Sequence, residues 1–93
     1  MIRKYSTYKV PDGKLLRISF LLDSAHRVFE VRICGDFFFF PEDAFLDLEK
    51  ALSGVLLDDV ATVVDSFIVE NAVSVIGFTG ADVWKAMHES TTK

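Results

Sequence analysis

The chain has 93 residues, of which 51% are hydrophobic and 26% are charged, with a formal net charge of −4. This length and composition are typical of one globular domain over residues 1–93, and the acidic balance argues against a nucleic-acid partner, because phosphate binding needs clustered Lys and Arg. No apolar run approaches the roughly 20 residues that would span a membrane. A single cysteine, Cys34, excludes a disulfide within the chain. We therefore expect a cytoplasmic protein with no membrane partner.

The first forty residues show the two-residue alternation of β-strands. We predict strands over residues 4–10, 15–23 and 28–34, with Phe29 inward on the third strand. Residues 11–13 are predicted to form a turn, because proline presets φ and glycine accepts the positive φ that follows. Short turns between consecutive strands indicate an antiparallel meander.

Helical periodicity begins after the third strand. Pro41 is predicted to open a first helix that ends near residue 52, because its missing N–H would have no partner at the first helical position. Asp58 is predicted to cap a second helix that ends at Asn71.

The last twenty residues contain one clear helix signal. Residues 73–76 form either a short strand or an extended tail segment, and Thr79 and Asp82 have the spacing of a capping box for a helix to about residue 88. Residues 90–93 are expected to fray. The predicted fold class is α+β, with a three-stranded antiparallel meander followed by two to three helices packed on one face.

Residues for catalysis or metal binding are scarce. Two His and one Cys without compact spacing do not make a metal site. Neighbouring carboxylates such as Asp47 and Glu49 fit a solvated helix face. Cys34 is the candidate nucleophile, with Arg32 on the same strand face to lower its pKa, but no base can be placed beside it. A thiol or sulfur-carrier protein that uses Cys34 therefore stays an alternative to a chain without an active site.

Four consecutive phenylalanines occupy residues 37–40. In an extended chain neighbouring side chains point to opposite faces, so two rings enter the core and two are left outward. Leaving one ring exposed forgoes roughly 1.5–3 kcal/mol. Either the chain's own helices or tail cover the outer pair, or a partner protein does, and a second copy of the chain is one such partner.

Two motifs resemble one known family. Residues 9–17 read KVPDGKLLR and are similar to its KVP-x-GKL-x-R opening; residues 35–54 begin GDFF, continue PE and end LE-x-x-L-x-G, as in its second signature. The family is the C-terminal accessory domain of lipoate–protein ligase, which in archaeal-type enzymes is a separate small subunit. The likeness covers most of residues 8–54 and continues loosely to the last helix.

The resemblance implies a subunit with no catalytic residues of its own. The large catalytic subunit of such a ligase is the partner. It binds lipoate and ATP, and the small subunit is needed to make lipoyl-AMP for protein lipoylation. The chain lacks the large subunit's lipoate- and nucleotide-binding motifs, so no cofactor is expected on it alone. The family's fold also resembles sulfur-transfer scaffold proteins, but their reactive cysteine lies on a loop, and Cys34 is predicted within a strand.

The resemblance also carries over to single residues. Lys14 matches the family's turn and is expected either to reach the nucleotide phosphates or an acidic patch of the large subunit, or to be a solvated lysine. Gly35 is expected at a bend and Asp36 on nearby backbone N–H groups. The implied partner interface is Lys14, Asp36, Phe37, Phe38, Phe39 and Phe40, and the residues that shape it are Pro11, Gly13, Gly35 and Pro41.

Overall fold

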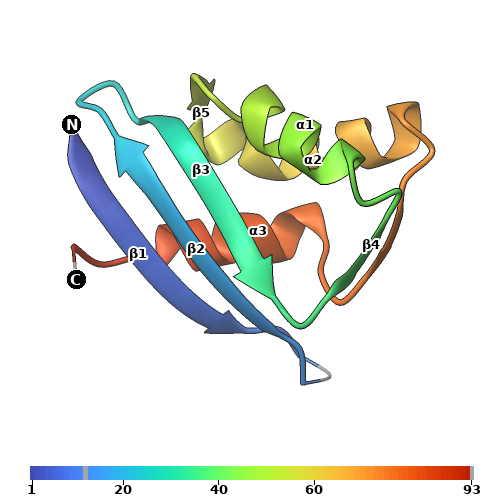
Figure 1. The fold of residues 1–93 in the computed structure, drawn as a ribbon. Helices are drawn as coiled ribbons and strands as arrows, with labels where there is room; N and C mark the ends of the chain where they lie inside the picture. The colour runs from blue at the N-terminus through green and yellow to red at the C-terminus, as the bar shows by residue number, and fades with distance from the viewer. Residues whose placement is uncertain (12, 93) are drawn as a thin grey trace.

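The computed structural model describes residues 1–11 and 13–92 and has an α+β architecture (Figure 1). A four-stranded antiparallel sheet has the order β1-β2-β3-β5, formed by Ile2–Lys9, Leu15–Leu22, Arg27–Gly35 and Val55–Leu56. Strand β4 (Phe38–Phe40) pairs with strand β6 (Ser74–Ile76) to form a separate two-stranded ribbon. The helices are α1, η1, α2 and α3, at Ala44–Ala51, Leu57–Asp59, Val60–Glu70 and Gly80–His88. The predicted fold class is confirmed.

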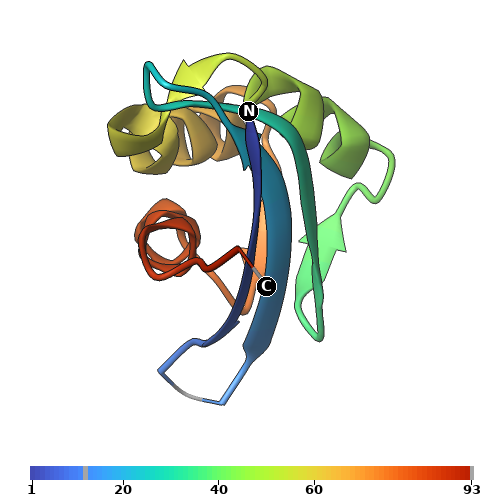
Figure 2. The ribbon, with the colours of Figure 1, turned by 90° about the vertical axis from the view of Figure 1, so that its left-hand side faces the viewer.

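The sheet divides into a buried and an open face, as the alternation predicts. Leu16, Ile18 and Phe20 of β2 are all buried on one face. Figure 2 shows α2 and α3 on one side of the sheet, and Figure 1 shows α3 behind the strands. None of the helices in the described part of the chain is long and apolar enough to cross a bilayer.

A β-bulge corrects the predicted facing of β3. Leu21 pairs with Phe29 and Ser19 with Arg32, so one residue of β2 lies opposite two residues of β3. Glu30 takes a positive φ of 48° at this point. The extra residue reverses the alternation, so Val28 is buried where Phe29 was expected, and Phe29 is only half-buried.

The predicted start of the first helix and that of the second helix are both wrong. Pro41 lies three residues before α1, because it follows β4 directly and its carbonyl accepts the Ala44 N–H in a turn. Asp58 lies in the 3₁₀ turn before α2, and its carboxylate accepts the indole N–H of Trp84 at 3.4 Å instead of capping the helix. Asn71 ends α2 as predicted.

Glu49 also departs from its predicted place on a solvated helix face. Its side chain is buried, and Oε2 accepts the backbone N–H of Ile33 at 2.8 Å. The short strand β5 pairs with Arg27 and Val28, and no other strand of the described residues lies beside the rest of that edge of β3. The α1 carboxylate takes the place of a strand carbonyl there.

The C-terminal region contains one confirmed and one wrong prediction. The capping box of Thr79 and Asp82 is present at the start of α3. The expected fraying is not seen through residue 92, because Thr91 forms a β-bridge with Tyr5 through two backbone hydrogen bonds. Lys93 and Asp12, the middle residue of the predicted turn, lie outside the described residues.

Candidate docking surface

The outward face of the β4–β6 ribbon carries three large apolar side chains, which we call the Phe38 patch: Phe38, Phe40 and Ile76. Their exposed fractions are 53%, 60% and 64%. Phe38 pairs with Ile76 across the ribbon, so their side chains share a face. The rings of Phe38 and Phe40 lie nearly parallel, with centroids 6.5 Å apart. Exposed apolar side chains gathered in this way are typical of a binding surface.

The other two rings of the phenylalanine run point inward. Phe39 is buried and Phe37 is half-buried. The Phe37 ring packs on Phe78 at 4.9 Å and on Phe45 at 5.5 Å, and Phe39 meets Phe45 at 5.0 Å. The prediction of two rings in and two rings out is confirmed, so Phe37 and Phe39 anchor the ribbon while Phe38 and Phe40 stay open.

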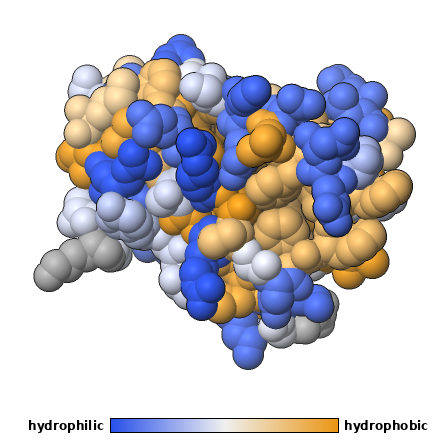
Figure 3. Space-filling view, in the orientation of Figure 1, coloured by the Kyte–Doolittle hydropathy of each residue, from blue (hydrophilic) through white to orange (hydrophobic). Residues whose placement is uncertain are grey.

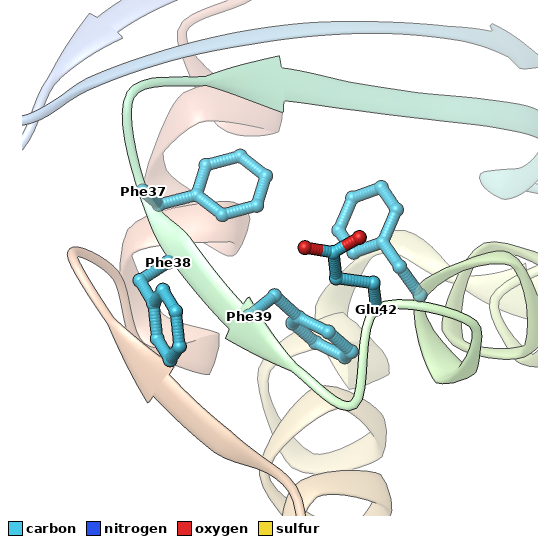
Figure 4. Close-up of a pocket in the computed structure, with 5 residues that line it drawn as sticks. Phe37, Phe38, Phe39 and Glu42 are labelled. Carbon is cyan, nitrogen blue, oxygen red and sulfur yellow. The ribbon is translucent and has the colours of Figure 1, made fainter.

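An open hollow of about 300 Å³ lies beside this ring cluster and is lined by Phe37, Phe38, Phe39, Glu42 and Phe45. Figure 4 shows Phe37 and Phe39 on one side of β4, Phe38 on the other, and the Glu42 carboxylate directed between Phe37 and Phe39. With four phenylalanine rings and one carboxylate around it, the hollow has the lining to accept an apolar side chain of another molecule next to a cationic group.

Lys14 borders a second hollow of about 350 Å³ on the β6 side of the patch, together with Pro11, Ile76 and Thr79. Its side chain is half-buried against Gly77, where an added Cβ would come 3.3 Å from the Lys14 Cγ. The structure therefore places Lys14 next to the Phe38 patch, although Lys14 and Phe38 are 24 positions apart in the sequence.

Asp36 fixes the link between β3 and the ribbon. Its Oδ1 accepts the backbone N–H of Leu15 at 2.8 Å, as expected of an aspartate in a turn. This hydrogen bond is the main cause that lowers the pKa of the Asp36 carboxyl; its own backbone N–H and the charges of Lys14 and Arg17 add to the effect, and desolvation opposes it. Asp36 thus has a structural role on this strand junction.

Two glycines shape the same junction. A Cβ on Gly35 would collide with the carbonyl oxygen of Leu15, which explains the glycine before the bend. Gly13 has a φ of 97° and donates its N–H to the Val10 carbonyl at 3.1 Å, as the predicted turn requires. Pro11 is exposed at that turn, and Pro41 ends β4.

The sequence reasoning missed two residues of this surface. Ile76 lies in a segment for which strand and tail were both open, and only its pairing with Phe38 shows that it joins the patch. Glu42, which follows Pro41 at the predicted start of the first helix, lines the first hollow. Neither role has a local sequence signal. The role of Ile76 depends on a strand partner more than thirty positions away, and that of Glu42 depends on a turn that makes the first helix begin later than predicted.

Two of the comparisons with known proteins point to the same kind of protein. No protein-family model matches the chain. The chain is 32% identical over 60 residues to lipoate-protein ligase A subunit 2 of Thermoplasma acidophilum; the match covers 64% of this chain and 63% of the relative, less than two thirds of its length. A chain from a solved archaeal lipoylation system of the same organism, described as a bipartite lipoate protein ligase and its E2 lipoyl domain, is 28% identical, with a TM-score of 0.77 over 92% of this chain and 94% of that chain.

This chain resembles the second subunit of a bipartite lipoate–protein ligase. The likeness to this ligase subunit confirms the resemblance drawn from the two motifs. At 28% identity the structural match extends beyond residues 8–54, where the motifs lie, to almost the whole chain.

Cys34 lies outside this surface, on the exposed face of β3, opposite Arg17 on β2. It is within a strand, as predicted, and not on a loop such as the sulfur-transfer scaffold proteins use. The structure describes no group of three or more His, Cys, Asp or Glu side chains that could hold a metal ion.

Proposed function

We propose that this chain is a non-catalytic subunit that docks on the catalytic subunit of a lipoate–protein ligase and enables it to form lipoyl-AMP. The observation that carries the proposal is the Phe38 patch on a fold similar to the bipartite ligase chain. In this complex the catalytic subunit binds lipoate and ATP, and this chain binds neither on its own.

The physical argument rests on the open rings. Phe38 and Phe40 are more than half exposed, although Phe37 and Phe39 on the same short segment are covered by the chain's own core. Covering an open ring stabilises a complex by a large part of the roughly 1.5–3 kcal/mol that full burial supplies. Docking is proposed to order or close the loops of the catalytic subunit around lipoate and ATP, which changes its activity without a reacting group from this chain.

The decisive experiment measures pyrophosphate release from lipoate and ATP. We expect none from this chain alone, little from the catalytic subunit alone, and rapid release from the mixture. Full activity of the catalytic subunit alone would overturn the proposal.

A second measurement identifies the step that is enabled. Preformed lipoyl-AMP is supplied to the catalytic subunit with an acceptor lipoyl domain. We expect lipoyl transfer at the same rate with and without this chain, since the proposed role ends with adenylation. A transfer step that also needs this chain would assign it a different role.

The predicted alternative of self-association has its own test. Sedimentation of the isolated chain is expected to show mostly monomer, because three side chains make a small contact. A stable dimer that Phe38→Ser dissolves would mean that the patch serves a second copy.

A further inference from the structure

The face of the four-stranded sheet turned away from α2 and α3 is a second open surface. The strand register places Thr7, Arg17 and Cys34 in one row across it, and Tyr5, Ser19 and Arg32 in the next, because paired residues of antiparallel strands share a face. Arg17, Arg32, Tyr5 and Cys34 are exposed.

The chain's charges are divided between the sheet and the helices. Residues 1–40 contain seven Lys or Arg and four Asp or Glu, whereas residues 41–93 contain three and ten. The cationic side chains of the sheet's open face therefore belong to the basic part of the chain, whereas residues 41–93 are acidic. Such a local excess of one sign attracts the opposite charge.

Arg17 and Arg32 are diagonal neighbours on adjacent strands, a spacing of roughly 7–8 Å between backbone positions. Neither takes part in an ion pair within residues 1–11 and 13–92, where the ion pair found joins Arg3 to Glu30 at 2.9 Å. The nearby Asp36 carboxylate already accepts the Leu15 N–H. Arg17 lies near enough to the Asp36 carboxylate to help lower its pKa, and Arg32 donates a hydrogen bond to the Val31 carbonyl at 3.2 Å. Among the described residues neither guanidinium forms an ion pair, so an acidic partner surface would supply one.

The Phe38 patch is too small to be a whole interface. Its three partly exposed side chains offer on the order of 300–400 Å², whereas a stable complex covers about 800 Å² on each partner. The interface must therefore extend over neighbouring surface. Figure 3 shows hydrophilic side chains over the sheet on the same side of the molecule as the apolar region over β4.

We infer that the interface with the catalytic subunit continues from the Phe38 patch across the open face of the sheet, where Arg17 and Arg32 bind an acidic surface of that subunit. This inference rests on the proposed function. The two parts of the interface then have different kinetic effects. The charges of Arg17 and Arg32 mainly raise the association rate, and the buried rings of the Phe38 patch mainly lower the dissociation rate.

The test is the association rate constant with the catalytic subunit, measured by stopped-flow fluorescence from 50 to 500 mM NaCl. We expect the rate constant of the unchanged chain to fall about tenfold over this range, and that of the R17E/R32E variant to be about tenfold lower at 50 mM NaCl and nearly independent of salt. Lys85→Glu is the matched control for Arg17→Glu: Lys85 is exposed on α3 and its exchange changes the net charge equally.

Four outcomes would separate the possibilities. Binding that is insensitive to salt and to R17E/R32E would overturn the inference and leave the proposed function standing. Equal slowing by Lys85→Glu and Arg17→Glu would overturn it too, since net charge alone would then explain the effect. No binding under any condition, together with no gain in lipoyl-AMP, would overturn the proposed function itself. Charge-dependent binding of a single-stranded oligonucleotide in place of the subunit would assign the face to nucleic acid and contradict the inference.

Discussion

Glu49 of α1 accepts a hydrogen bond from the backbone N–H of Ile33 of β3, with 2.8 Å between Oε2 and the nitrogen. The side chain is 7% exposed, so the N–H would be left without a partner if the carboxylate were removed. We expect Glu49→Ala to lower the free energy of unfolding by about 1–3 kcal/mol. Urea unfolding measures this loss.

Two variants control this prediction. Glu49→Gln keeps an acceptor oxygen and is expected to lose less than Glu49→Ala. Asp47→Ala removes an exposed carboxylate from the same helix and is expected to stay within about 0.5 kcal/mol of the unchanged chain. Equal losses of unfolding free energy in Asp47→Ala and Glu49→Ala would show that the hydrogen bond to Ile33 contributes nothing measurable to stability.

The Phe38 patch predicts a selective loss of binding. We expect Phe38→Ser and Phe40→Ser each to weaken binding to the catalytic subunit by about 2 kcal/mol, roughly a thirtyfold rise in Kd, because both rings are central to the proposed contact. Calorimetric titration gives the Kd. The thermal unfolding temperature of the free chain should not fall, since both rings are exposed in it.

Val69→Ser is the matched control for the two phenylalanine variants. Val69 is 79% exposed on α2 and is not one of the patch residues, so its exchange removes exposed apolar surface and leaves Phe38, Phe40 and Ile76 unchanged. Binding that survives the Phe38 and Phe40 exchanges unchanged would exclude the patch from the interface.

Asp36 predicts a defined pH dependence of stability. Its pKa lies below the ordinary value of 3.8 in the folded chain, first because of the Leu15 N–H. A group whose folded pKa is depressed stabilises the fold above its unfolded pKa, and this contribution is lost as pH falls through the folded pKa. We expect the stability difference between the unchanged chain and Asp36→Asn to be constant above pH 5 and to shrink below pH 3.8. A difference that grows on acidification would contradict the assignment.

Gly13 lies in the turn of the first motif and Gly35 lies before the bend. Together they allow the cost of a strained backbone conformation to be compared with the cost of a steric collision. Gly35→Ala is expected to lower the free energy of unfolding by well over 1 kcal/mol, because φ is 154° and the new Cβ would meet the Leu15 carbonyl oxygen. Gly13→Ala carries the conformational cost alone, about 1 kcal/mol, since nothing lies within 4 Å of its Cβ position. Chemical unfolding of the pair gives the cost of the collision by difference.

Periodicity predicted the long elements because each buries a repeated face. The three strands of the meander and the first two helices follow from it, whereas the last helix was predicted from the capping box of Thr79 and Asp82. Strands β4 and β5 were missed because three and two residues are too few to show alternation. Pro41 was misplaced because a proline after a short strand and a proline at a helix start look alike in sequence.

The surface was only partly predictable for a similar reason. Four phenylalanines in a row must divide between two faces, so two exposed rings followed from residues 37–40 alone. Which residues lie beside those rings depends on the pairing of β4 with β6, and so Ile76 and Gly77 had no signal. The bulge at Glu30 was likewise hidden, because one extra residue on a strand reverses its faces without changing its composition.

The shortness of the β4–β6 ribbon has a consequence for how a partner is held. Each strand has three residues, so an incoming strand would find very few free backbone groups along either edge. Recognition by β-augmentation, in which main-chain hydrogen bonds supply the affinity, is therefore disfavoured. In the proposed complex the ribbon presents aromatic side chains, and partner choice then depends on the shape of the surface that covers them.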